Sequence, residues 1–451
     1  MNRREFLHRT SATGLGTGLG VTILSNPGSV KGTPANEKVN LAFLGCGGRG
    51  TYLAKGFLER DDVNIVACYD PNHDRAELFS KVPADKGQKT KVAKDMREVL
   101  DDKSVDAVVS ATPDHWHALI TVLSCQAGKD VYIEKPASHS AWEGWQMVQA
   151  ARKYKRIVQH GTQNRSAAYN MKARKYIEEG KLGKVHFARI YNMKSWPNLP
   201  LSPECDPPAG FDWNTWSGPA PLHHYRQIYT RYWHHFWDYS SGDIINDAIH
   251  QIDLCRMLIN KEFPKSVYCV GERFNSQGAA QTPDTQVATF EYDDMLVTFE
   301  LTLYTPYMLK IDPEVRNNDM FPYWPQCATR IEIYGEKGVM IIGRHGGGWQ
   351  VFERTKQREP VVTSQEYGRF PDPEHKENFI HCIRTRETPN ADIEIGFRSV
   401  LLAQYATISN RLGGQKIVVD AKNNGAIVGC PEAAPYYKRT YRAPFVVPDQ
   451  V

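Results

Sequence analysis

The residues best suited to bind a ligand form one glycine-rich segment, Gly45-Cys46-Gly47-Gly48-Arg49-Gly50. It lies between a strand-like run, Val39–Leu44, and a helix-like run, Thr51–Glu59. Glycines at these positions allow a tight turn and close approach of a pyrophosphate, which then faces the helix N-terminus. An acid, Asp70, ends the next strand-like run, twenty residues beyond Gly50. This pattern predicts a dinucleotide site contacted by Gly45, Gly47, Gly48, Arg49, Gly50 and Asp70.

The acid also bears on which dinucleotide is bound. A carboxylate at Asp70 would hydrogen-bond the adenosine ribose and repel a 2′-phosphate, which favours NAD over NADP. Arg75 lies close by in the sequence, and an arginine there can accept that phosphate. We therefore expect NAD as the cofactor and keep NADP as an alternative.

Two further segments follow strand-like runs of the same region: Thr112-Pro113-Asp114-His115-Trp116-His117 and Glu134-Lys135-Pro136. Ligands of open α/β sheets collect at the carboxyl ends of the strands. A lysine there, next to a nicotinamide, can polarise a carbonyl or hydroxyl group during hydride transfer. Lys135 is therefore a candidate catalytic residue. For His115 and His117, cofactor contact and a hydrogen-bonded structural role both remain open.

The elements around these segments predict an α/β protein of two parts. Up to about residue 160, strand-like and helix-like runs alternate, which is typical of a doubly wound parallel sheet. From about residue 184 the chain is rich in β-strand patterns, with Asp293-Asp294 as a hairpin turn, and predicts a large, mostly antiparallel open sheet. Trp196–Pro221 is expected to be an irregular surface excursion, and Ile393–Leu412 a helix.

Five motifs in order resemble the glucose–fructose oxidoreductase / inositol dehydrogenase family, called Gfo/Idh/MocA. They are Gly45–Gly50, Thr112–His117, Glu134-Lys135-Pro136, Gly161-Thr162-Gln163-Asn164 and His250-Gln251-Ile252-Asp253. The resemblance implies a Rossmann domain at 36–161 and a substrate-binding α/β domain at 162–451. It also implies that the 393–412 helix packs back on the first domain, and that the protein is a homo-oligomer.

The resemblance assigns roles to particular residues. It implies that Lys135 contacts substrate and nicotinamide, and that His250 accepts or donates the proton. The cofactor contacts it implies beyond the glycine loop and Asp70 are Thr112, Pro113, His115, His117, Glu134, Lys135 and Gln163. The family often has an aspartate four residues before the histidine, where this chain has Asn246 and then Asp247. Both spacings share a helical face with His250, so either residue can approach it; Asn246 can orient substrate but cannot take a proton.

The region Tyr225–Trp237 concentrates aromatic and histidine side chains just upstream. Aromatic faces beside polar groups suit the C–H faces and hydroxyl edges of sugars, although an ordinary core remains the alternative. No cysteine pair has the spacing of a zinc site, and His115-Trp116-His117 has no further ligand at a metal-site spacing except Asp114. We therefore expect no metal.

The N-terminus resembles an export signal. Arg3-Arg4-Glu5-Phe6-Leu7 is a twin-arginine pattern, followed by a weakly apolar run that is too short to span a membrane. We expect residues 1–35 to be a signal peptide, the protein to be periplasmic, and no transmembrane span. Nine scattered cysteines fit folding in the cytosol before export. The net charge of +4, three charges of which lie in the first 31 residues, leaves no electrostatic footprint for nucleic acid.

Two functions remain open. The first is reversible hydride transfer between NAD(P) and a secondary alcohol of a sugar or cyclitol, with the cofactor retained through the cycle because an exported enzyme lacks a free NAD pool. The alternative is an NAD-dependent glycosidase or lyase, in which transient oxidation allows elimination and bond cleavage. A binding protein without turnover is a third, less favoured class, since Gly45–Gly50, Lys135 and His250 are all present.

Overall fold

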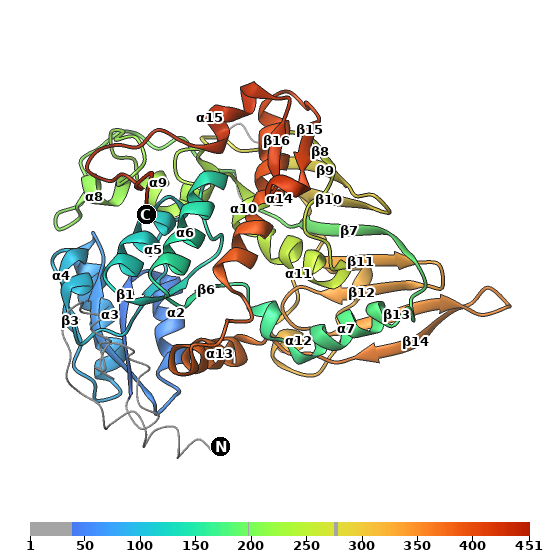
Figure 1. Cartoon of the computed structure of the whole chain (residues 1–451), viewed down its shortest axis with the longest axis horizontal. Helices are drawn as coiled ribbons and strands as arrows, with labels where there is room; N and C mark the ends of the chain where they lie inside the picture. The colour runs from blue at the N-terminus through green and yellow to red at the C-terminus, as the bar shows by residue number, and fades with distance from the viewer. Residues whose placement is uncertain (1–37, 197, 275–277) are drawn as a thin grey trace, which may run out of the picture.

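The chain folds around two β-sheets in a computed structural model that describes residues 38–196, 198–274 and 278–451. The proposed signal peptide lies outside these residues. Figure 1 shows the smaller sheet on one side of the molecule, the larger sheet on the other, and helices between and around them. The predicted fold class, a Rossmann-type parallel sheet plus a large open sheet, is confirmed.

The first sheet has six parallel strands in the order β3-β2-β1-β4-β5-β6. Its strands are β1 Val39–Leu44, β2 Val63–Tyr69, β3 Lys91–Val92, β4 Ala107–Ser110, β5 Asp130–Ile133 and β6 Val158–His160. The helices between them are α2 Gly48–Phe57, α3 His73–Ala84, α4 Met96–Asp101, α5 His117–Gln126 and α6 Ala141–Lys153. Nearly every residue of β1, β4 and β5 is buried, as expected for a parallel sheet covered on both faces.

The second sheet has ten strands in the order β14-β13-β12-β11-β7-β10-β9-β8-β15-β16, and only the β7–β10 pair is parallel. The strands are β7 Val185–Met193, β8 Ser266–Glu272, β9 Thr285–Glu291, β10 Leu296–Thr302, β11 Arg330–Gly335, β12 Val339–Gly343, β13 Trp349–Arg354, β14 Pro360–Glu366, β15 Ile417–Asp420 and β16 Ala426–Val428. The Asp293-Asp294 turn joins β9 to β10, where the amide of Tyr292 donates to the carbonyl of Met295 at 3.0 Å.

Helices link the two sheets. α11 Ile249–Ile259 packs with β7 and with α7 Ala168–Glu178, and α13 Asp372–Thr385 runs beside the first domain (Figure 1). α14 Ile393–Arg411 contacts α6 on one side and α11 and β8 on the other. The long helix is buried along most of its length, because it packs between both parts of the chain.

The expectation for Trp196–Pro221 was wrong in one respect. Short helices α8 Trp213–Ser217, α9 Gln227–Tyr232 and α10 Asp243–Asn246 lie in or after this stretch, and Trp213 and Trp216 are buried. Together with Tyr225, Phe236 and Tyr239 they form a separate small aromatic core. The part from Trp213 on is therefore packed, because Trp213 and Trp216 stack on each other, whereas residues 200–210 are mostly exposed and form no helix or strand, as expected.

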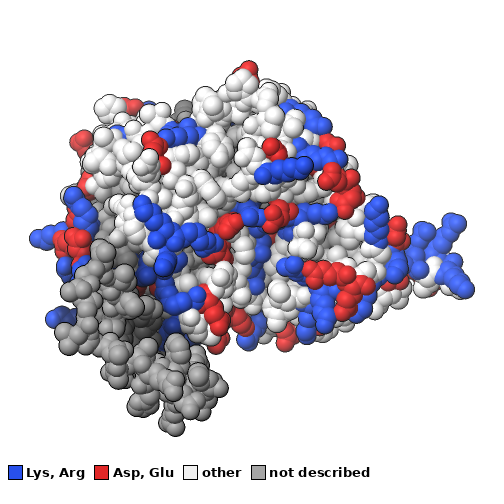
Figure 2. Space-filling model, in the orientation of Figure 1, with Lys and Arg blue, Asp and Glu red and all other residues white. Residues whose placement is uncertain are grey.

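Charged side chains of both signs are interspersed over the face seen in Figure 2. The nine cysteines are all unpaired, and only Cys205 is exposed. None of the helices in the described part of the chain is both long enough and apolar enough to cross a membrane.

Candidate active site

The glycine loop joins β1 to α2 in the conformation that the motif predicts. Gly45 has φ +93°, and a Cβ atom there would lie 2.8 Å from the backbone of Ala111. A Cβ on Gly50 would lie 2.1 Å from the carbonyl oxygen of Gly45. By contrast, nothing lies within 4 Å of where a Cβ would sit on Gly47 or Gly48. The loop is therefore packed on one side and open on the other, where the N-terminus of α2 can face an anion.

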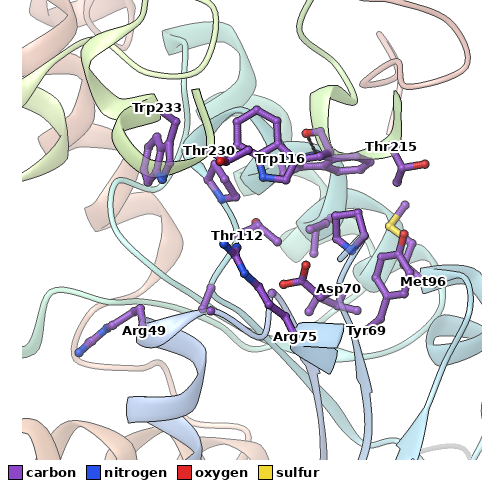
Figure 3. A pocket seen from close by; sticks show the side chains of 18 of the residues that line it. Arg49, Tyr69, Asp70, Arg75, Met96, Thr112, Trp116, Thr215, Thr230 and Trp233 are labelled. Atoms are coloured by element: carbon purple, nitrogen blue, oxygen red, sulfur yellow. Dashed lines mark hydrogen bonds between the residues drawn. The ribbon is translucent and has the colours of Figure 1, made fainter. Parts of the chain in front are cut away.

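A cavity of about 380 Å³ opens at this loop. Figure 3 shows Asp70, Arg75 and Arg49 on one side of it, with Trp116, Thr215, Thr230 and Trp233 facing them from the other. The lining residues are Leu44, Gly45, Gly47, Gly48, Arg49, Tyr69, Asp70, Pro71, Arg75, Met96, Ala111, Thr112, Pro113, Trp116, Ile120, Thr215, Trp216, Thr230 and Trp233. The loops after β1, β2 and β4 thus supply one wall, and the segment around α8 and α9 supplies the other.

Asp70 supports the loop from within. Its carboxylate accepts hydrogen bonds from the backbone amides of Cys46 and Asn72, both at 2.8 Å. Burial raises its pKa, and the two amides and Arg75 oppose that shift. Arg75 lines the same cavity. The acid and the arginine that distinguish NAD from NADP therefore lie together, as the sequence suggested.

Glu134 and Gln163 were predicted as cofactor contacts, but neither lines the cavity. Glu134 is buried and accepts from Arg49 Nε at 2.7 Å and Nη2 at 2.6 Å. The side-chain amide of Gln163 is oriented so that its oxygen faces a donor and its nitrogen faces an acceptor. The oxygen accepts from Arg49 Nη2 at 2.7 Å, and the nitrogen donates to the Gly161 carbonyl at 2.9 Å. Both residues therefore position Arg49, whose charge holds the pKa of Glu134 below its usual value despite burial.

His115 and His117 also lie behind the cavity wall rather than in it. The Nε2 atom of His115 is 3.0 Å from the carbonyl oxygen of Trp216, and burial lowers the pKa of His115 to about 3. His117 Nδ1 and Nε2 lie 2.6 Å and 2.9 Å from the carbonyl oxygens of Pro136 and Thr112. Of the two open alternatives for these histidines, the geometry favours the structural one. Thr112 and Pro113 do line the cavity.

Lys135 and Asn246 meet where the two parts of the chain come together. Lys135 Nζ donates to the backbone carbonyl of Asn246 at 2.7 Å and lies 3.5 Å from its side-chain oxygen. Burial lowers the pKa of Lys135, while Glu134, Asp247 and Asp114 oppose the shift. The predicted lysine is thus held against the end of α10, immediately before the helix that carries His250.

His250 is buried on α11, 4% exposed, and its ring centroid is 4.2 Å from that of His345. Its Nδ1 atom has no hydrogen-bond partner among the described residues. Burial lowers the pKa of His250 well below its ordinary value, and the charges of His345, Arg344 and Lys135 act in the same direction. The imidazole is therefore neutral near pH 7.

Asp247, also proposed as a catalytic residue, is engaged elsewhere. Its carboxylate accepts from Lys194 Nζ and Arg344 Nη2, each at 2.7 Å, and lies 3.3 Å from Lys310 Nζ. These cations hold its pKa well below the usual range although burial raises it. Asp247 stays ionised and cannot carry a proton, so its role is to hold cations near His250. No local pattern in the sequence singled out Lys194, Lys310, Arg344 or His345.

In the described ranges, no group of three or more His, Cys, Asp or Glu side chains is arranged to hold a metal ion. The wall residues Thr215, Trp216 and Thr230 were also not predicted. Trp233 lay in the aromatic stretch expected to bind sugar, whereas it borders the dinucleotide cavity. Another residue of that stretch, His234, is nearer to the Lys135 region, since the charges of Lys135 and Lys194 help to lower its pKa.

Comparison with known proteins shows similarity along most of the chain. Residues 39–162 match the model "Oxidoreductase family, NAD-binding Rossmann fold", and residues 211–341 match the "GFO/IDH/MocA C-terminal domain". A myo-inositol 2-dehydrogenase of Thermotoga maritima is 23% identical over 82% of this chain and 95% of that protein. A glycosyl hydrolase family 109 protein of Saccharopolyspora erythraea is 29% identical over 41% of this chain and 44% of that protein.

A solved structure supports the same fold. The aldose-aldose oxidoreductase of Caulobacter crescentus, complexed with glycerol, superposes with a TM-score of 0.63 at 16% identity. The match covers 85% of this chain and 100% of the Caulobacter chain. At that identity the likeness establishes the shared two-sheet architecture.

Proposed function

Because the chain belongs to the Gfo/Idh/MocA family of oxidoreductases, whose first domain is an NAD-binding Rossmann domain, we propose that it transfers a hydride between NAD and a secondary alcohol of a sugar or cyclitol. The observation that carries this proposal is the placement of Lys135 beside the α10–α11 segment that bears neutral, buried His250. The inositol dehydrogenase among its relatives supports an alcohol of this kind as substrate.

The two side chains suit complementary roles. Lys135 Nζ, held near the end of α10, donates a hydrogen bond to the reacting oxygen and stabilises negative charge on it. His250 accepts the hydroxyl proton, for which its low pKa keeps the imidazole unprotonated at neutral pH. NAD held at the glycine loop would supply the hydride acceptor for this reaction. Asn246 Oδ1, 3.5 Å from Lys135 Nζ, orients the substrate or the lysine but carries no proton.

The open faces of Gly47 and Gly48 and the N-terminus of α2 fit the pyrophosphate of NAD. Asp70 fits the adenosine ribose, because its oxygens retain lone pairs beyond the two amides they already accept from. NADP remains a second candidate cofactor, since Arg75 lines the same cavity and can meet a 2′-phosphate.

The same cavity supports retention of the cofactor through the cycle. Residues 210–233, which we call the strap, supply Thr215, Trp216, Thr230 and Trp233 to the cavity wall. The start of the strap is held by the first domain, where His73 N donates to Gly210 O at 3.0 Å and Asp212 N donates to Pro71 O at 2.8 Å. The C-terminal tail holds the same part of the strap through Arg442, which donates to the side chain and carbonyl of Asn214 at 2.6 Å and 2.7 Å and to the carbonyl of Ala220 at 3.2 Å. Release of a dinucleotide under the strap requires these contacts to open, which slows its exchange.

A second candidate is cleavage of a glycosidic bond by transient oxidation and elimination, with NAD regenerated. The similarity to a glycosyl hydrolase family 109 protein favours it, as does Asn246 where the resemblance leads us to expect an aspartate. Both candidates use Lys135, His250 and NAD, and they differ in whether an aglycone leaves.

One experiment tests both. The purified protein is denatured and any released dinucleotide is identified by mass spectrometry. Intact protein is then given free sugars, cyclitols and nitrophenyl glycosides while NADH fluorescence and released nitrophenol are followed. Hydride transfer predicts NADH signal with free sugars or cyclitols, and cleavage predicts nitrophenol without net NADH. Protein that neither retains nor binds NAD(P) contradicts both candidates.

We also propose that the protein is exported by the twin-arginine route and forms homo-oligomers. The residues that support export, 1–35, lie outside the described part. Support for self-association comes from apolar side chains exposed on one face of the large sheet, such as Tyr268, Val270 and Val287. Fractionation of the native host and light scattering of the purified protein test these two proposals separately.

A further inference from the structure

Positive charges outnumber negative ones around Asp247. Lys194 Nζ lies between the carboxylates of Asp243 and Asp247, each within 2.8 Å. Arg344 and Lys310 also converge on Asp247. Three cations thus share two carboxylates. Lys135 adds a positive charge close enough to lower the pKa of His250, and the carboxylates of Glu134 and Asp114 act on that lysine in turn. An uncompensated charge in a largely buried site is costly, and a bound anion would remove that cost.

Arg344 has two guanidinium nitrogens that are not used in hydrogen bonds with the described residues. Its side chain is only 9% exposed, and one nitrogen, Nη2, donates to Asp247. Its Nε and Nη1 atoms are buried and have no partner among the described residues. Leaving a buried donor unsatisfied is costly, and more so when the donor is charged. Arg344 follows β12 directly, so the sheet fixes its backbone beside the helix that carries His250.

One more cation borders the same place. Arg316, on α12 Pro313–Asn317, lies with its guanidinium 3.8 Å from the ring centroid of Phe370. It forms no ion pair with any carboxylate of the described residues, and the charges of Arg344 and Arg49 help burial to lower its pKa. Phe370 contacts His345 at 4.6 Å between centroids, and His345 contacts His250. Arg316 is thus linked to His250 through two intervening rings, those of Phe370 and His345.

Solvent reaches this group from the long connection between β10 and β11. The Lys310 side chain is 51% exposed although its ammonium is 3.3 Å from Asp247. Arg316 is half-buried on the same connection. Arg344 therefore forms the buried end of a cationic group, and Lys310 and Arg316 form its accessible end.

We propose that the substrate of this enzyme carries an anionic group, a carboxylate or a phosphate ester, that Arg344, Lys310 and Arg316 bind next to His250. This inference rests on the proposed function and narrows its substrate class to acidic sugars. The unpartnered Nε and Nη1 groups of Arg344 lie on different edges of the guanidinium, and each can donate a hydrogen bond to an oxygen of such a group. A neutral sugar hydroxyl can accept one of these hydrogen bonds but leaves the excess positive charge uncompensated.

The test measures binding separately from turnover. NAD-loaded protein is titrated by calorimetry with matched pairs: D-glucuronate and D-glucose, D-galacturonate and D-galactose, and D-glucose 6-phosphate. We expect at least one acidic member to bind tenfold or more tightly than its neutral partner, and the preference to weaken as salt is raised. The carboxylates and the phosphate ester distinguish the two sources of the charge.

Variants show whether the named cations are responsible. We expect Arg344→Gln to abolish the acidic preference, and Lys310→Gln and Arg316→Gln each to reduce it about threefold or more. The latter two change exposed or half-exposed side chains, so they remain informative if Arg344→Gln fails to fold. Lys416→Gln is the matched control, because this exposed lysine adjoins β15, near the opposite edge of the large sheet.

The outcome separates this inference from the proposed function. Turnover of neutral sugars with no acidic preference, or a preference that survives all three substitutions, overturns the anionic site but leaves hydride transfer standing. A panel in which no acidic sugar binds also overturns it. Tight binding of acidic sugars without any change in NAD redox state or bond cleavage supports the anionic site and contradicts the proposed function.

Discussion

Asp114 offers a quantitative test of the electrostatics around Lys135. Its carboxyl group is fully buried after β4, where Ser240 Oγ donates to Oδ2 at 2.5 Å and Asn246 Nδ2 lies 3.5 Å from Oδ1. Burial raises its pKa to about 7, against opposing contributions from Ser240, Lys135 and Asn246. The perturbation is Asp114→Asn, which keeps the shape of the side chain and removes its ability to ionise.

The size of the effect on stability follows from the difference between the pKa of Asp114 in the folded state and its pKa in the unfolded state. The unfolded carboxyl titrates near pH 3.9 and the folded one near pH 7, a difference worth about 4 kcal/mol. Because the folded pKa is raised, this contribution is fully present below pH 4 and is lost as pH rises through 7. Between pH 5 and pH 8 the free energy of unfolding of the wild-type protein should fall by about 3 kcal/mol because of Asp114. The asparagine variant should not show this fall.

The assay is urea unfolding at pH 5, 6.5 and 8 with saturating NAD, comparing wild type, Asp114→Asn and Asp101→Asn. Asp101 is an exposed residue at the end of α4 and controls for loss of one negative charge. We expect the free energy of unfolding of Asp114→Asn to rise relative to wild type by about 3 kcal/mol across this range. A difference that does not change with pH, or that the Asp101 variant reproduces, would refute the assignment of a raised pKa to Asp114.

Three further substitutions test the proposed site. Lys135→Met should lower the rate of hydride transfer by about 10²–10⁴-fold while bound NAD, measured by mass spectrometry, is retained; an unchanged rate would exclude Lys135 from catalysis. Gly50→Ala should weaken NAD binding at least tenfold by fluorescence titration, because the added Cβ would meet the Gly45 carbonyl at 2.1 Å. Arg442→Gln removes the hydrogen bonds from the C-terminal tail to Asn214 in the strap, so it should speed NAD release about fivefold in stopped flow, as expected for a loss of about 1 kcal/mol. Release as slow as in wild type would contradict a retaining strap.

Local sequence was enough to predict the dinucleotide loop and the fold class. At Gly45 and Gly50 a side chain would collide with backbone atoms, so only glycine fits there. The spacing of these glycines in the sequence is therefore enough to predict the loop. The alternation of apolar strands with helices likewise predicted the parallel sheet, because strands buried on both faces must be apolar throughout. Lys135 was singled out by its position after such a strand, and His250 by its resemblance to a family motif.

Only the tertiary structure decided what the neighbours of these residues do. Glu134 and Gln163 contact Arg49 rather than the cavity, and Asp247 is held by cations that follow it by up to 97 residues or precede it by 53. No local pattern encodes such pairings, since they depend on how β7, β12 and α10 are brought together by the large sheet. The same holds for Trp216, which reaches the dinucleotide cavity because the strap folds back over the first domain. Short-range chemistry therefore specified the binding loop, whereas long-range packing set the charge around the reacting groups.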